Sequence, residues 1–180
     1  DESPPAADPA PWRIPEARAD WEALSPDALR NIIRQAGIVG MGGAAFPAHV
    51  KLAPPSDRRI DTLIINGAEC EPYLTCDHRV MLENTRDVVT GVRILRHILG
   101  IDQVLVGIED NKPDAIVHMT AAFQGVDAVT VVPCRVKYPQ GAERQLIEAL
   151  TKRQVPPPPG LPMDVGVVVQ NVGTCHAISE

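Results

Sequence analysis

Asp61 to Asn66 read DTLIIN, a short apolar run that ends at Asn66-Gly67. A run of this length without polar alternation predicts a β-strand buried on both faces. Three later runs have the same character: Gln103 to Ile108, Ala128 to Val132 and Val165 to Gln170. We therefore expect a sheet that is covered on both sides.

Segments with helical spacing separate these strands. Asp77 to Leu99 is predicted to be a helix with a break near Asn84-Thr85, and shorter helices are predicted from Asn111-Pro113 to about Phe123 and from Gly141 to Leu150. Strands that alternate with helices of about a dozen residues are typical of βαβ units. The predicted fold class is α/β, a Rossmann-like three-layer domain with a mostly parallel sheet of about four strands.

A further helix and an arm precede the sheet. Ser25 is a predicted N-cap, Pro26 the first helical residue and Gly37 the stop signal. The proline-rich and acidic residues 1–24 predict an extended arm or linker, with Trp12 and Trp21 as anchors on the body. Residues 25–180 are predicted to form the domain, in which Thr174 caps a helix near the end of the chain.

The glycine-rich stretch from Gly37 to Lys51 reads GIVGMGGAAFPAHVK. Glycines let another molecule approach the backbone N–H groups, and successive free N–H groups form an anion-binding concavity to which Lys51 adds a positive charge. The pattern matches a dinucleotide fingerprint, but a helix precedes it and Phe46-Pro47 follows it, so it is not an ordinary Rossmann turn. A phosphate-bearing cofactor is one interpretation, and a flexible loop without a ligand is the other.

In open α/β sheets, ligands bind outside the carboxyl ends of the strands. The segments that follow the four predicted strands are rich in glycine, amides, acids and a tyrosine: residues 66–72, 109–111, 137–141 and 170–174. In residues 66–72, Glu69 and Glu71 could act as acid and base or bind ribose hydroxyls. A turn whose Asn and Glu cap the next helix explains the same residues.

Composition excludes several function classes. The net charge is -6, no basic cluster offsets it, and two Trp, two Tyr and two Phe leave few rings for stacking, so a nucleic-acid partner is not expected. No run approaches the roughly 20 apolar residues that span a bilayer. The four cysteines form no C-x-x-C pair, which argues against a metal site or cluster built wholly from this chain. A Cys76–His78 nucleophile has no supporting motif.

Four separated motifs resemble a known family. They are GIVGMGGAAFPAHVKL, DTLIINGAECEPYLTCDHRVM, VKYPQGAERQLIEALT and GVVVQNVGTCHAI. Together they resemble the C subunit of the Rnf/Rsx ion-translocating electron-transport complex, which is similar in turn to the FMN- and NADH-binding subunit of respiratory complex I. The resemblance extends from about Pro26 to the end of the chain.

The resemblance implies a domain that holds FMN and exchanges a hydride with NAD(H). The cofactors supply that chemistry, so no catalytic side chain is expected. The implied cofactor-binding residues are Gly40, Gly42, Gly43, Phe46, Lys51, Asn66, Glu69, Glu71, Tyr138, Gly141, Glu143, Asn171 and Thr174.

The resemblance also implies partners and a location. It implies a place among the subunits of a membrane electron-transport complex, peripheral on the cytoplasmic face of the bacterial inner membrane, with ferredoxin as an indirect partner. The family's two [4Fe-4S] clusters and small domain are expected only downstream of this chain, which we expect to be a fragment. A related cobalamin reductase and a non-catalytic docking module of the same fold are the alternatives.

Departures from the family pattern concern the predicted site. Ala45 stands where the family usually has glycine, which adds a methyl group to the loop. Compared with the complex I subunit, Ala68 replaces an aspartate and Ala142 a glutamate. The contacts to the flavin and the nucleotide are therefore not expected to be identical in the two families.

Overall fold

The computed structural model describes residues 20–180. The predicted anchor Trp12 and most of the predicted arm lie outside the described residues. Trp21, in the short 3-10 helix η1 (Trp21–Ala23), packs against the core. Its ring meets that of His97 edge-on at 6.0 Å, and the Arg93 guanidinium lies 5.5 Å from its centroid. The predicted anchoring by Trp21 is confirmed, while the domain boundary at residue 25 stays a prediction.

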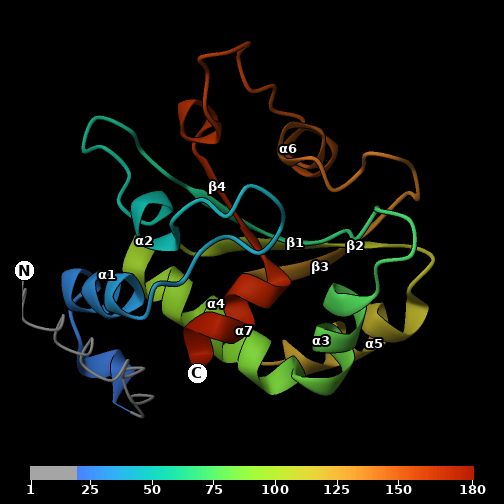
Figure 1. The fold of residues 1–180 in the computed structure, drawn as a ribbon, viewed down its shortest axis with the longest axis horizontal. Helices are drawn as coiled ribbons and strands as arrows, with labels where there is room; N and C mark the ends of the chain where they lie inside the picture. The colour runs from blue at the N-terminus through green and yellow to red at the C-terminus, as the bar shows by residue number, and fades with distance from the viewer. Residues whose placement is uncertain (1–19) are drawn as a thin grey trace, which may run out of the picture.

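All four strands are parallel and form one sheet in the order β3-β2-β1-β4 (Figure 1). The predicted number, type and pairing direction of the strands are confirmed, with ends shifted by one or two residues. The strands are β1 (Thr62–Gly67), β2 (Gln103–Glu109), β3 (Val129–Cys134) and β4 (Val167–Asn171). Val165, the predicted start of the last strand, instead ends the 3-10 helix η2 (Pro162–Val165).

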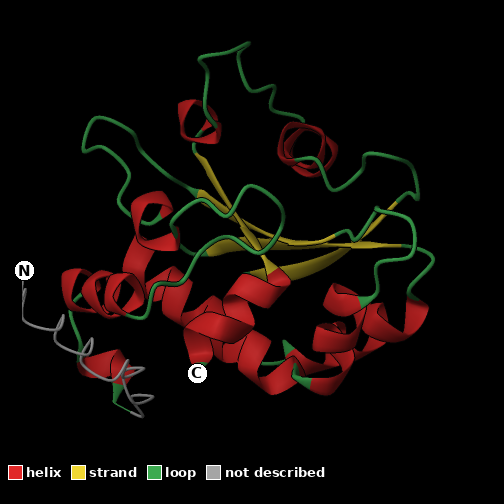
Figure 2. Cartoon of the chain, in the orientation of Figure 1, coloured by secondary structure: helices red, strands yellow, loops and turns green. Residues whose placement is uncertain are grey.

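The helices cover the two faces of the sheet unequally (Figure 2). One face carries α6 (Glu143–Thr151) and η2, which pack on Ile64, Val167 and Val169. The other face carries the remaining helices and the larger core. These are α1 (Pro26–Gln35), α2 (Ala48–Lys51), α3 (Cys76–Glu83), α4 (Thr85–Leu99), α5 (Pro113–Ala122) and α7 (Val172–Ser179).

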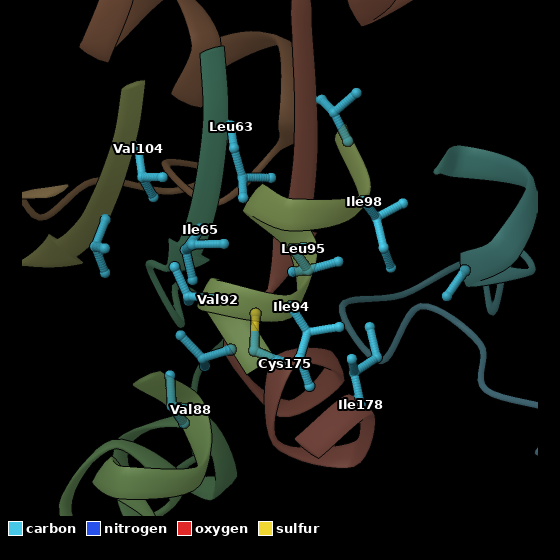
Figure 3. Packing of buried hydrophobic residues seen from close by; sticks show 14 of the residues in the cluster. Leu63, Ile65, Val88, Val92, Ile94, Leu95, Ile98, Val104, Cys175 and Ile178 are labelled. Atoms are coloured by element: carbon cyan, nitrogen blue, oxygen red, sulfur yellow. The ribbon is translucent and has the colours of Figure 1, made fainter. Parts of the chain in front are cut away.

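Helix α4 lies at the centre of the larger core. Its buried Val92 and Leu95 face Leu63 and Ile65 of β1, and Cys175 of α7 lies beside them (Figure 3). Each such fully buried aliphatic side chain stabilises the fold by roughly 1.5–3 kcal/mol. Because α4 packs on both β1 and α7, it links the sheet to the helix that follows β4.

Capping residues account for several of the helix boundaries. The Ser25 hydroxyl accepts the N–H of Ala28 at 3.2 Å, which confirms the predicted N-cap of α1. Gly100, with φ of 63°, ends α4. The predicted capping role of Thr174 is wrong: α7 begins at Val172, and the Asn171 side chain accepts the N–H groups of Gly173 and Thr174. An asparagine at the strand end supplies the acceptor one turn earlier than the threonine could.

The strand order reverses between β1 and β4. The connections from β1 to β2 and from β2 to β3 run through α3, α4 and α5, whereas the connection from β3 to β4 runs through α6 on the opposite face. Where the order of strands reverses and the connections on either side lie on opposite faces of the sheet, a crevice opens at the carboxyl ends of the strands. The fold therefore places a crevice at the ends of β1 and β4.

Candidate functional site

Two adjoining hollows occupy this crevice. The larger, about 380 Å³, is lined by the glycine loop, the ends of β1 and β4 and the segment that leads into α6. The smaller, about 240 Å³, extends toward the start of α3. The predicted site residues that line the larger hollow are Gly40, Gly42, Gly43, Phe46, Lys51, Asn66, Glu71, Tyr138, Gly141, Glu143 and Asn171. Four segments far apart in the sequence thus meet at one place.

The glycine loop is held at its two ends and free in the middle. The N–H of Gly40 donates to Phe46 O at 2.8 Å, and the N–H of Met41 donates to the Thr174 hydroxyl at 2.9 Å. Within the described residues, the N–H groups of residues 42–46 donate no hydrogen bond. The loop therefore presents consecutive unpaired N–H groups, which is the arrangement that binds anions.

Two of the loop glycines are required by their positions. A Cβ on Gly42 would lie 3.2 Å from the Cβ of Asn171, so the loop packs directly against the end of β4. Gly43 has φ of 141°, a conformation that side chains rarely adopt. Ala45 also has a positive φ, 50°, although it carries a side chain. An alanine in this left-handed conformation strains the loop.

Lys51 and Glu143 both line the larger hollow and form an ion pair there. The Lys51 Nζ lies 2.8 Å from Glu143 Oε1 and 3.1 Å from the carbonyl oxygen of Val169. The two side chains are 30% and 38% exposed, so the pair is accessible to a ligand. Among residues 20–180, Lys51 is the only cation that lines the larger hollow, and Glu143 compensates its charge.

The turn after β1 has a structural role in the described contacts. Asn66 donates to Gly141 O at 2.9 Å and accepts the N–H of Ala68 at 3.0 Å. Glu69 accepts the N–H groups of Asp77 and His78 at the start of α3, at 2.9 and 3.3 Å. These contacts agree with the alternative interpretation from the sequence, in which the glutamate of this turn caps the next helix. Glu69 lines only the smaller hollow, and Thr174 lines neither hollow.

The loop before α6 forms the opposite wall. A Cβ on Gly141 would overlap Ala68 O, and its N–H donates to Cys70 Sγ at 3.3 Å, so this loop touches the turn after β1. Tyr138 is 74% exposed and Phe46 is 47% exposed, and both line the larger hollow. These two rings can stack on a planar ligand.

The hollows are also lined by polar residues outside the predicted set, among them Gln170, Cys70 and Asp77. Gln170 is 2% exposed and lines the larger hollow, and its buried Nε2 has no partner within the described residues. Cys70 lines the larger hollow and Asp77 the smaller one. The sequence offered one usable signal for Gln170, its place at the carboxyl end of a buried strand. Asp77 had no such signal, because its place in the site depends on its hydrogen bond with Asn171, which is distant in the sequence.

The cysteines are not arranged as nucleophiles. The Cys76 thiol donates to Glu69 Oε1 at 3.2 Å, and this hydrogen bond raises the pKa of the Cys76 thiol. His78 instead meets Asp114, with Nε2 and Oδ1 2.9 Å apart. Burial raises the pKa of the Cys175 thiol. The possible Cys76–His78 pairing considered from the sequence is therefore absent from the described contacts.

Asp77 connects α3 to the end of β4. Its Oδ2 accepts the Asn171 Nδ2 at 2.6 Å, and Asn171 in turn contacts Gly42. Burial, with added repulsion from Glu69 and Glu71, raises the pKa of Asp77 to about 6 despite the hydrogen bond from Asn171. Glu69, Cys76 and Asp77 bring three potential metal-ligand atoms within 4.8 Å of one another, but the hydrogen bonds to Glu69 and Asp77 already engage this group.

This pKa gives stability a defined pH dependence. The folded chain binds more protons than the unfolded chain between the ordinary aspartate pKa of 3.8 and about 6, so the free energy of unfolding falls as pH rises through this window and then levels. Asp77→Asn removes the buried charge, and we expect it to be more stable than the parent by about 2 kcal/mol at pH 7.5, with the difference vanishing toward pH 4. Urea unfolding at several pH values measures this.

Asp127→Asn is the matched control for Asp77→Asn, because Asp127 is exposed and its side chain makes no contact within the described residues. The control should follow the parent at every pH. A constant offset between Asp77→Asn and the parent from pH 4.5 to 8 would contradict the assignment of the titration to Asp77.

The chain belongs to a family of flavin-binding domains. The family described as the Nuo51 FMN-binding domain matches residues 33–180. Among solved structures, the chain resembles a chain of an NAD+-reducing [NiFe]-hydrogenase in the H2-reduced state, with a TM-score of 0.76 and 25% identity, covering 88% of this chain and 31% of that one.

Curated relatives define the branch of the family. The chain is 60% identical over 167 residues to the C subunit of the proton-translocating ferredoxin:NAD(+) oxidoreductase complex of Clostridium ljungdahlii. It is 48% identical over 159 residues to the C subunit of the Na(+)-translocating complex of Acetobacterium woodii. These matches cover 93% and 88% of this chain but 36% of each relative, so the chain spans about a third of their length. The resemblance to the Rnf-type C subunit is thereby confirmed.

The helices were compared with the length and hydropathy that a membrane span requires. None of those within residues 20–180 combines the length and the apolar character needed to cross a bilayer.

Proposed function

We propose that the crevice between β1 and β4 binds FMN and NAD(H), and that the chain is the flavin module of a ferredoxin:NAD oxidoreductase of the ion-translocating type. The observation that carries this proposal is the meeting of the glycine loop with the ends of β1 and β4 around one hollow. The family match and the relatives' names support it.

The residues present fit a phosphorylated, planar ligand. The unpaired N–H groups of residues 42–46 and the Lys51 ammonium provide donors for a phosphate. The buried Nε2 of Gln170 lacks an acceptor that a polar ligand atom would supply. The exposed rings of Phe46 and Tyr138 suit stacking on a flavin or a nucleotide.

The protein's contribution is binding and orientation. Bound FMN and NAD(H) supply hydride transfer, and no side chain is required as acid, base or nucleophile. Asn66 and Gly141 hold the two walls of the crevice together, and Asn171 supports the glycine loop. Glu143 holds the Lys51 ammonium at the wall of the hollow.

The proposal extends to the longer protein. Electrons would pass between the flavin and two [4Fe-4S] clusters in segments beyond this chain, and from there to or from ferredoxin. The protein would associate peripherally with the other subunits of the complex at the cytoplasmic face of the bacterial inner membrane. The curated names favour this role over the cobalamin reductase considered from the sequence.

Flavin binding tests the proposal directly. The purified chain is titrated with FMN and the quenching of flavin fluorescence is followed, and NADH is then added without oxygen while the flavin absorbance is recorded. We expect saturable binding with one FMN per chain and bleaching by NADH. Ala44→Glu, which places a negative charge in the hollow, should weaken binding about tenfold or more.

Ala53→Glu is the matched control, because Ala53 is exposed and does not line the hollow. It adds the same charge and should leave FMN binding unchanged. Retention of full affinity in Ala44→Glu would place FMN elsewhere. Absence of binding in both this chain and the full-length protein would support the non-catalytic docking module instead.

A further inference from the structure

A third hollow is lined by the end of β3 and the loop that follows it. Its volume is about 550 Å³, and residues 132–137, Gln140 and the end of α6 line it. It includes none of the predicted cofactor-binding residues. The proposed function leaves this hollow without a role.

Three positive charges line this hollow: Arg135, Lys137 and Lys152. Within residues 20–180, none of the three pairs with an acidic side chain, although the chain carries a net charge of -6. Lys152 donates only to the carbonyl oxygen of Ala149, at 3.1 Å, and this contact satisfies one acceptor at the end of α6. Unpaired cations that converge on a hollow favour an anionic ligand.

Acidic side chains also lie on the elements around this hollow. Glu109 pairs with the Lys112 ammonium at 3.1 Å. Asp110 Oδ1 accepts the N–H of Val136 at 3.3 Å, and Glu148 Oε1 accepts from Gln154 at 2.9 Å. Within residues 20–180, none of these carboxylates forms an ion pair with Arg135, Lys137 or Lys152, although Asp110 lies beside Val136 between two of the cations.

Gln140 also indicates a ligand in this hollow, independently of the charges. Its side chain lines the hollow and is 2% exposed, and its buried Nε2 has no hydrogen-bond partner within the described residues. A buried amide without a partner destabilises a fold, whereas an apolar residue of similar size at the same place does not. An acceptor atom of a ligand would satisfy this donor.

We propose that the hollow bounded by Arg135, Lys137, Gln140 and Lys152 binds a compact phosphoryl anion, either free phosphate or the phosphate of a small metabolite. Arginine binds phosphate through two parallel N–H groups, and the lysines add mobile point charges. A phosphoryl group offers three terminal oxygens, enough acceptors for these cations and the Gln140 amide. A carboxylate offers two.

The site is adjacent to the flavin hollow. Lys137 and Gln140 face the anion, while Tyr138 and Gly141 of the same loop line the crevice between β1 and β4. An anion that fixes this loop can therefore alter the neighbouring nucleotide site through a shared wall.

The test uses the 180-residue chain at constant ionic strength. Inorganic phosphate, pyrophosphate and succinate are titrated separately, and backbone amide chemical shifts are followed by NMR. We expect saturable shifts in residues 134–141 with phosphate or pyrophosphate, with Kd near or below about 1 mM, and at least roughly tenfold weaker binding of succinate. Stronger binding by pyrophosphate than by phosphate would indicate a phosphorylated metabolite rather than the free ion.

Two variants and a control locate the binding. Arg135→Gln/Lys137→Gln should weaken phosphate binding by about tenfold or more, whereas Arg86→Gln, which removes an exposed cation of α4 outside the hollow, should not change it. Gln140→Leu should lose affinity while its thermal midpoint stays equal to or above that of the parent. A purely structural Gln140 would instead give a lowered midpoint.

The contrary outcomes are distinct. No saturable binding of phosphate or pyrophosphate, or binding that the double variant leaves intact, would overturn the site. Preferential binding of succinate would overturn the phosphoryl assignment. FMN affinity measured in the same double variant should match the parent, so failure of this site and failure of the flavin site are separable.

Discussion

Replacing Gly91 with alanine should destabilise the fold by about 2 kcal/mol or more. Gly91 lies in α4, where an added Cβ would overlap the carbonyl oxygen of Cys175 and lie 2.6 Å from its carbonyl carbon. Backbone atoms of a helix cannot move aside locally, so α4 and α7 must separate, at a cost of about 3 kcal/mol. The better helix propensity of alanine offsets about 1 kcal/mol of that cost. Urea unfolding measures the difference.

Gly100→Ala is the control for this prediction. Gly100 caps the same helix with φ of 63°, and an added Cβ would meet nothing within 4 Å. Only the backbone conformation opposes the substitution, so the expected loss is about 1 kcal/mol. Equal stability of Gly91→Ala and the parent would show that the two helices do not need this close approach.

The Gly91 substitution should also affect the site. Helix α7 carries Thr174, whose hydroxyl fixes the Met41 N–H of the glycine loop, and Asn171 at its start packs on Gly42. Displacement of α7 therefore shifts the wall of the flavin hollow. FMN affinity should fall in Gly91→Ala and be retained in Gly100→Ala.

The sequence predicted the sheet because its signals are local. The runs from Asp61 to Asn66 and from Gln103 to Ile108 are mostly apolar, and a segment with helical spacing separates each from the next run. Parallel pairing then follows from chain connectivity. The predicted start of the last strand at Val165 was wrong because this apolar residue belongs to a 3-10 turn. The apolar pattern alone does not distinguish such a turn from a strand.

Much of the site was also predictable, since strand ends and glycine loops have fixed places in this class of fold. The roles were harder to predict. Glu69 and Thr174 were expected to contact the cofactor, but the described contacts use them to cap α3 and to hold the loop. Asp77 owes its role to Asn171, 94 residues away in the chain, which no local pattern encodes. Gln140 and Gln170 owe theirs to side-chain burial.

Lys51 and Glu143 should change FMN affinity in opposite directions. Lys51→Met removes the only cation of the flavin hollow among the described residues, and the loss of a charge-assisted hydrogen bond should weaken FMN binding by about tenfold or more. Glu143→Gln removes the carboxylate that lies 2.8 Å from the ammonium. The freed charge should then strengthen FMN binding by about threefold, since partial exposure screens the pair.

Stability separates this electrostatic effect from unfolding. Both side chains are about a third exposed, so breaking their ion pair should cost less than about 1 kcal/mol in either variant. Arg86→Met and Asp127→Asn remove one charge of each sign outside the hollow and should leave FMN affinity unchanged. The double variant Lys51→Met/Glu143→Gln should bind FMN with intermediate affinity. If both single variants weaken FMN binding equally, the pair acts by positioning the loop before α6, and the lysine does not serve as a phosphate partner.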